Sequence, residues 1–119
     1  MKWILVAGCG HTGTTITAKI IGLNSCVHGF EKETNFLRLR KLHRVKQIKK
    51  AFSVKARARG KEFICEKTPK HIERIDFARR ILPDPFFVLC TRNPYDAIAS
   101  LAARESPRIN NEVIKIGFK

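Results

Sequence analysis

The chain has 119 residues and a formal net charge of +14, which arises from 24 Lys and Arg residues against 10 Asp and Glu. This length predicts a single domain over residues 1–119, large enough to bury a hydrophobic core but small for an enzyme. We expect neither a membrane-spanning helix, which needs roughly 20 apolar residues, nor a signal peptide, because the apolar run near the N-terminus is too short. The charge favours an anionic ligand or partner.

Apolar periodicity divides the first half of the chain into alternating strands and helices. An apolar run predicts a strand over residues 2–7, and a glycine-rich turn leads from it into a helix over residues 14–22. A short strand is expected near residues 26–28. Apolar residues at helical spacing from Phe36 onward predict one long basic helix, and a second main strand follows over residues 62–65.

The second half of the chain continues the alternation. Thr68 and Pro69 have the pattern of a helix N-cap followed by the first helical residue. The continuous apolar run at 86–90 predicts a strand that is buried on both faces. Asn93 and Pro94 repeat the cap-and-proline signal, which predicts a helix that ends near residue 104.

These elements together predict an α/β fold with a three-layer parallel sheet and a phosphate-binding loop of the P-loop type. Ligands on such sheets bind at the carboxyl ends of the strands. Polar residues follow all three main strands, in the glycine-rich turn, at residues 66–68 and at residues 91–93. This convergence predicts the functional site at that edge of the sheet.

The glycine-rich turn has the spacing of a phosphate-binding loop, with its first glycine at Gly8 and its last at Gly13. Glycines permit the tight turn, and the N–H groups at the start of the following helix converge on an anion. Nucleoside triphosphatases place a lysine where Thr14 stands here, and that lysine reaches the β- and γ-phosphates. Its absence indicates a different phosphate donor and makes a nucleotide kinase only the third candidate function.

A second polar motif follows the strand at 86–90. Arg92 stands at the strand exit, and Ser100 lies two turns into the next predicted helix. A guanidinium and a hydroxyl can hold one phosphate from two sides. In the alternative interpretation, Arg92 pairs with Asp96 and Ser100 is a small packing residue. The presence of the glycine loop favours phosphate binding.

The glycine loop and the Arg92 motif, in this order, resemble the sulfotransferases, which use 3′-phosphoadenosine 5′-phosphosulfate as sulfonate donor and need no metal. The resemblance spans roughly residues 3–102. It implies that Arg92 and Ser100 bind the 3′-phosphate of the donor. The residues that it assigns to the 5′-phosphosulfate are Gly10, His11, Thr12, Gly13, Thr14 and Thr15. Family members are usually longer, so we expect the domain to lack the C-terminal part that completes their pocket.

The resemblance also implies which groups would catalyse sulfonate transfer. The family base is often a glutamate shortly after the first helix, which points to Glu33, with Glu31 as second choice. His11 stands where the family usually has Lys or Arg, and an imidazolium there would assist the leaving group, so activity would fall at higher pH. Lys67 is expected to contact the sulfonate or an acidic acceptor. In the alternative interpretations, the glutamates favour a helix dipole, His11 caps the loop and Lys67 is solvated.

Between Arg38 and Lys61 there are eleven Lys or Arg residues and no carboxylate. This stretch suits an anionic acceptor, and it equally fits the solvated face of an amphipathic helix. Because this stretch has a single phenylalanine, Phe52, and no series of aromatic residues interleaved for base stacking, we expect no specific nucleic acid partner. His43 and His71 have no matching partner residues and are expected on the surface.

Four cysteines, Cys9, Cys26, Cys65 and Cys90, form neither a CxxC pair nor a zinc-ligand spacing. We therefore expect reduced thiols and a cytoplasmic location. The resemblance implies a sulfotransferase that acts on a hydroxyl or amine of an acceptor that the sequence does not identify. The alternative is a non-catalytic module that binds a nucleotide or a polyanion.

Overall fold

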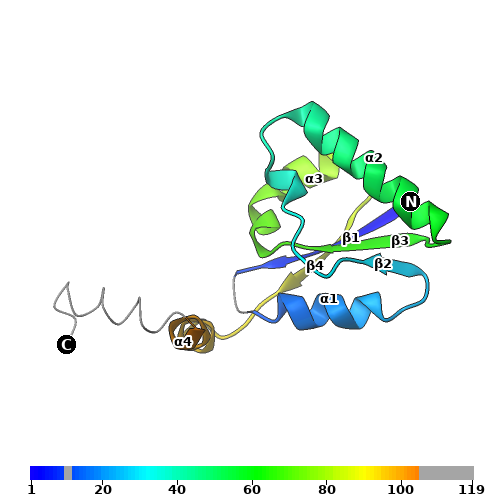
Figure 1. Cartoon of the computed structure of the whole chain (residues 1–119). Coiled ribbons are helices and arrows are strands. Elements are labelled where there is room, and N and C mark those ends of the chain that lie inside the picture. The colour runs from blue at the N-terminus through cyan, green and yellow to red at the C-terminus, as the bar shows by residue number, and fades with distance from the viewer. Residues whose placement is uncertain (10–11, 105–119) are drawn as a thin grey trace.

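The computed structural model describes residues 1–9 and 12–104, which include a four-stranded parallel sheet with helices on both faces (Figure 1). Its strands are β1 (Lys2–Gly8), β2 (Val27–Gly29), β3 (Phe63–Lys67) and β4 (Phe86–Cys90). They lie in the order β2-β3-β1-β4, so β1 is central and is flanked by β3 and β4. The predicted parallel α/β fold is therefore confirmed.

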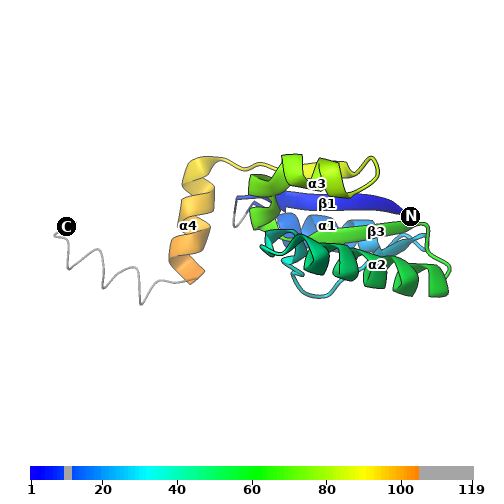
Figure 2. The same ribbon diagram turned by 90° about the horizontal axis from the view of Figure 1, so that it is seen from above.

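The described helices are α1 (Thr14–Gly22), the short 3₁₀ helix η1 (Phe36–Arg38), α2 (Leu42–Ala58), the 3₁₀ helix η2 (Pro69–Arg74), α3 (Ile75–Ile81) and α4 (Pro94–Arg104). Those that cover the sheet form two layers, with α1 on one face and α2 and α3 on the other (Figure 1). Figure 2 shows α4 standing off the end of the sheet. Within the described part of the chain, no helix is long and apolar enough to cross a membrane.

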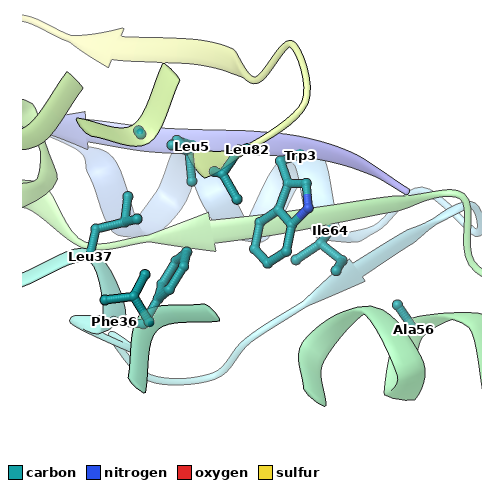
Figure 3. Packing of buried hydrophobic residues seen from close by; sticks show 9 residues of the cluster. Trp3, Leu5, Phe36, Leu37, Ala56, Ile64 and Leu82 are labelled. Carbon is teal, nitrogen blue, oxygen red and sulfur yellow. The ribbon is translucent and has the colours of Figure 1, made fainter. Parts of the chain in front are cut away.

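The core has one cluster on each face of the sheet because successive side chains of β1 point to opposite faces. Trp3 and Leu5 are buried with Phe36, Ile64 and Leu82 on the side of α2 and α3 (Figure 3). A second cluster on the α1 side consists of Val6, Val27 and Cys65. Burial on both sides explains why the first strand reads as a continuous apolar run.

The long basic helix predicted from Phe36 onward is divided in the structure. Phe36 and Leu37 lie in η1 and are buried, whereas α2 begins only at Leu42. Asn35, just before η1, has a positive φ of 54°. Its backbone N–H donates to Thr68 Oγ1 at 3.1 Å, which ties this turn to the end of β3. Leu39 has an extended backbone (φ −65°, ψ 138°), which ends η1 and separates it from α2. Apolar spacing alone does not indicate this break.

The prediction that residues 86–90 form a strand buried on both faces is wrong. β4 is an edge strand, and Phe86 and Leu89 expose 56% and 47% of their surface. Phe87 and Val88 are only partly buried, against the clusters on the two faces. The strand lies beside β1 alone among the described strands, and α4 leads away from it (Figure 2).

The cysteine at the end of the apolar part of β3 is expected to be chemically inert. Cys65 is buried, and burial together with the neighbouring Glu66 charge raises the pKa of its thiol to about 11. Alkylation at pH 8 should modify the exposed Cys9 and Cys26 in the folded protein and reach Cys65 only in denaturant. Mass spectrometry of the labelled peptides measures this, and labelling of Cys65 as fast as Cys26 would contradict the buried position.

Candidate functional site

The three polar segments predicted from the sequence leave neighbouring strands of the sheet. In the parallel register, Val6 of β1 is opposite Lys67 of β3, and Gly8 of β1 is opposite Cys90 of β4. The glycine loop therefore starts between the exits of β3 and β4. Because parallel strands end at one edge, the fold brings the start of all three segments together, as the sequence predicted.

The glycine loop leads into α1 in a geometry that suits an anion. Gly13 occupies the N-cap position with a left-handed backbone (φ 86°, ψ 20°), and no described side chain caps this end of the helix. The first N–H groups of a helix have no partner inside the helix and carry the positive end of its dipole. Thr14 is buried and Thr15 is exposed. The N-terminal end of α1 thus suits the phosphate group that the loop was predicted to bind.

Two threonine hydroxyls shape the loop from within. Thr12 Oγ1 donates to the carbonyl of Cys9 at 2.6 Å, and Thr17 Oγ1 donates to the carbonyl of Gly13 at 2.8 Å. The donors in both bonds are side-chain hydroxyls and not backbone N–H groups. Two predicted donor-binding residues, Gly10 and His11, lie outside the described residues.

Gly8 is required where it stands because the backbone of β4 passes very close to it. A Cβ atom at this position would lie 2.6 Å from the carbonyl oxygen of Cys90 and 2.9 Å from Thr12 Oγ1. Gly8→Ala should therefore push the glycine loop and the β4 exit apart. We expect a loss of about 1–3 kcal/mol in the free energy of unfolding, measured by urea denaturation. Gly22→Ala is the control, because its φ is not positive and a Cβ there would lie 4.0 Å from its nearest neighbour, the Cα of Gly29.

The Arg92 segment connects β4 to α4. Arg92 is exposed, two residues beyond Cys90, and Ser100 is half-buried in α4. Asn93 Oδ1 accepts a hydrogen bond from the N–H of Tyr95 at 2.9 Å, so the predicted cap-and-proline start of this helix is confirmed. That Arg92 and Ser100 bind the same phosphate stays a prediction.

A buried carboxylate organises the end of β3. Glu66 is fully buried, and its Oε1 atom accepts hydrogen bonds from Thr34 Oγ1 at 2.6 Å and from Thr68 Oγ1 at 2.5 Å. Its Oε2 atom lies 2.8 Å from Nδ1 of His71, which is 2% exposed. We call Thr34, Glu66, Thr68 and His71 the Glu66 network. It joins the segment after β2 to the exit of β3.

The network also keeps Glu66 ionised. Burial acts to raise the pKa of Glu66, but the hydrogen bond and attraction of His71, with the hydrogen bonds of Thr34 and Thr68, outweigh it and hold the pKa below its usual value. A buried charge of this kind is stable only while its partners remain in place. The loop at Thr34 is therefore held firmly against β3.

Glu33 and Lys67, predicted separately as base and as sulfonate or acceptor contact, meet in the structure. Lys67 Nζ lies 3.0 Å from Glu33 Oε1. Glu33 precedes Thr34 of the Glu66 network, and Lys67 follows Glu66, so the same network positions both side chains. The helix-dipole alternative for Glu31 and Glu33 is not supported, because α2 starts at Leu42 and has no acidic residue in its first turn.

Two adjoining hollows open beside this ion pair. One, which we call the α1 hollow, has a volume of about 590 Å³ and is lined in part by Thr15, Lys19, Glu31 and Lys67. The other, the α2 groove, has a volume of about 740 Å³ and includes Glu31 and Glu33 in its lining. Glu31, the second-choice base, lines both. The Glu33–Lys67 pair thus stands between a hollow that reaches the glycine loop and a groove along α2.

Sequence reasoning misplaced two members of the Glu66 network. His71 was expected on the surface and is buried, whereas His43 is exposed as predicted. Thr68 was expected to cap a helix, but its side chain makes no capping bond and donates to Glu66 instead. One signal was available, since a glutamate that continues an apolar strand requires buried partners. Two of these partners, Thr68 and His71, are close to Glu66 in sequence, whereas Thr34 is 32 positions away.

Comparison with known proteins gives one family. Residues 38–112 match the model of the family described as Sulfotransferase family, which is more than half of the chain. The matched range includes Glu66, Thr68 and His71 of the Glu66 network and the whole Arg92 segment, and it begins after Glu33 and Thr34. A search of curated proteins gave no match.

Proposed function

Because the chain belongs to the sulfotransferase family, we propose that it transfers a sulfonate from 3′-phosphoadenosine 5′-phosphosulfate to a hydroxyl or amine of an acceptor. One observation carries the proposal. Lys67 lines the hollow that reaches Thr15 in the first turn of α1, directly after the glycine loop, and its ion-pair partner Glu33 lines the adjoining α2 groove. A donor and an acceptor placed in these two hollows would meet at this pair.

The residues at the pair match the needs of sulfonate transfer. The bound donor would supply an activated sulfonate. Glu33 would take the proton from the attacking hydroxyl or amine, and the Lys67 ammonium would stabilise negative charge on the transferring group. The N–H groups at the start of α1 would hold the 5′-phosphosulfate, with His11 assisting departure of the phosphate. The α2 groove would orient the acceptor.

The proposed 3′-phosphate contact gives a sharp binding test. Arg92→Ala should weaken the binding of adenosine 3′,5′-bisphosphate by roughly 30-fold, since a hydrogen bond to a charged group contributes about 2 kcal/mol. Binding of adenosine 5′-phosphosulfate, which has no 3′-phosphate, should change little. Isothermal titration calorimetry measures both ligands, and Arg44→Ala on the exposed side of α2 is the matched control.

Equal losses for the two nucleotides would remove Arg92 from the proposed 3′-phosphate site. Bisphosphate binding without any transfer from radiolabelled donor to a mixture of acceptors would favour a non-catalytic binding module. Stronger stabilisation by ATP and magnesium than by the bisphosphate would favour a kinase-like protein.

We further propose that the chain acts as one domain in the cytoplasm, where the free thiols of Cys9, Cys26, Cys65 and Cys90 would remain reduced.

A further inference from the structure

The α2 groove has a basic end that the transfer chemistry does not use. Glu33 lines the groove where the segment after β2 meets β3, whereas Lys55 and Arg59 line it at the C-terminal end of α2. Neither Lys55 nor Arg59 forms an ion pair with another described residue. The groove therefore joins the proposed base to two uncompensated cations.

A buried histidine at this end lacks a hydrogen-bond partner. His28 of β2 is 4% exposed, and its Nε2 atom is buried without a partner among the described residues. Burial, and then the charges of Arg59, Lys55 and Lys61, hold the pKa of His28 below its usual value, so the imidazole is neutral. A neutral imidazole can donate or accept a hydrogen bond with a ligand, and a buried polar atom without a hydrogen-bond partner calls for an explanation.

One wall of the groove between the two ends is aromatic. The ring centroids of Phe30 and Phe52 are 4.7 Å apart, and His28 contacts Phe30 edge-on with centroids 5.0 Å apart. Ile48 lines the same groove. This wall suits a flat apolar body such as an aromatic ring.

We propose that the α2 groove binds a small amphipathic acceptor that carries an anionic group, a carboxylate or a sulfate. The anion lies at Lys55 and Arg59 beside His28, the apolar body lies against Phe30 and Phe52, and the reacting hydroxyl or amine lies at Glu33. The assignment rests on the proposed transfer function, which it deepens by naming the acceptor class. Its recognition is charge complementarity at one end and apolar burial along the wall.

A second basic groove on α2 provides the comparison. It is lined by Lys46, Lys49, Lys50, Arg57 and Arg80, and has a volume of about 470 Å³. No aromatic residue lines it, and Lys49 Nζ is already bound to the carbonyl oxygen of Ile81 at 2.9 Å. Its cations can attract an anion, but it offers no aromatic wall.

Two fluorescent probes separate the anionic contact from apolar binding. 1-Anilinonaphthalene-8-sulfonate carries a sulfonate, and N-phenyl-1-naphthylamine has the same aromatic body without it. The double variant Lys55→Gln/Arg59→Gln should weaken the binding of the sulfonate probe about tenfold and change the affinity of the neutral probe by less than twofold. His28→Phe, which keeps the ring and removes Nε2, should weaken the sulfonate probe about threefold. Lys46→Gln/Lys50→Gln has the same charge change on the same helix and should alter neither probe.

Three results would overturn the assignment. They are unchanged affinity of the sulfonate probe in the Lys55/Arg59 variant, an equal loss for the neutral probe, and an equal loss in the Lys46/Lys50 variant. Each is read from equilibrium binding and needs no turnover, so the outcome does not depend on whether transfer occurs.

A matched pair of acceptors then links the subsite to transfer. 3-(4-Hydroxyphenyl)propionate and its neutral amide present the same phenol, and the wild-type protein should prefer the anion in kcat/KM. Lys55→Gln/Arg59→Gln should abolish that preference. No transfer to either phenol, with the expected probe binding, would count against the proposed function and leave the subsite supported. Transfer without preference, together with unchanged probe binding, would remove the subsite and leave the function intact.

Discussion

Replacement of Glu33 by glutamine is expected to reduce kcat for sulfonate transfer by about 10²–10⁴-fold, the usual contribution of a positioned general base. Glutamine keeps the size of the side chain and can still accept a hydrogen bond from Lys67, but it cannot take a proton from the acceptor. Binding of adenosine 3′,5′-bisphosphate should be unchanged, because Glu33 lines the α2 groove and not the α1 hollow. Initial rates with radiolabelled donor and calorimetry with the bisphosphate measure the two effects.

Glu31 provides the control for this prediction. It is a second carboxylate on the same segment and lines both hollows, but it makes no ion pair with Lys67. Glu31→Gln should retain kcat within a few-fold. Full activity of Glu33→Gln would exclude Glu33 as the base, and a large loss in Glu31→Gln alone would transfer the role to Glu31.

Replacement of Glu66 by alanine is expected to lower the free energy of unfolding by about 3–5 kcal/mol, as for other buried ion pairs from which one partner is removed. Thr34, Thr68 and His71 would all lose their common acceptor in the protein interior. Small domains have only about 5–15 kcal/mol of stability, so this is a large fraction. Urea denaturation followed by the fluorescence of Trp3, the single tryptophan of the chain, measures the loss.

Two further variants make this result interpretable. Glu66→Gln keeps the shape and one acceptor oxygen, and should be destabilised less than Glu66→Ala. Glu62→Ala, an exposed glutamate next to the same strand, should change stability by less than about 0.5 kcal/mol. If Glu66→Ala is as stable as Glu62→Ala, the network does not hold the end of β3.

Acid should destabilise the fold through Glu66 and His28. The pKa of each group is held below its usual value, so each contributes stability at higher pH that is lost as the pH falls through its folded-state pKa. The loss from His28 begins below about pH 6.5, and the loss from Glu66 begins below about pH 4.5. His28→Phe should remove the first part of the decline, and Glu66→Gln should remove the second part.

Much of the candidate site could be predicted because its residues follow strands. Lys67 and Arg92 stand two residues beyond the last apolar residue of a predicted strand, and parallel strands place such residues at one edge whatever their distance in sequence. Glu33 was found only through the family resemblance. The Glu66 network could not be predicted as a whole, because Thr34 meets Glu66 across 32 positions of sequence, although Thr68 and His71 lie within five positions of it. The basic stretch at residues 38–61 was predicted to suit an anionic acceptor, but Lys55 and Arg59 were not distinguished within it and His28 was not identified, because the α2 groove forms between segments that are distant in sequence.

By itself the sequence determined the order of strands and helices, the position of the glycine loop and the basic character of α2, since these depend on local apolar spacing, turn residues and charge. Helices α1 and α4 and strand β4 have the predicted bounds for this reason. Only the tertiary structure decided that the chain breaks before α2, that β4 is a half-exposed edge, and that His71 is buried beneath Glu66. Hydrogen bonds and burial between segments distant in sequence control these features, and local sequence patterns do not indicate such contacts.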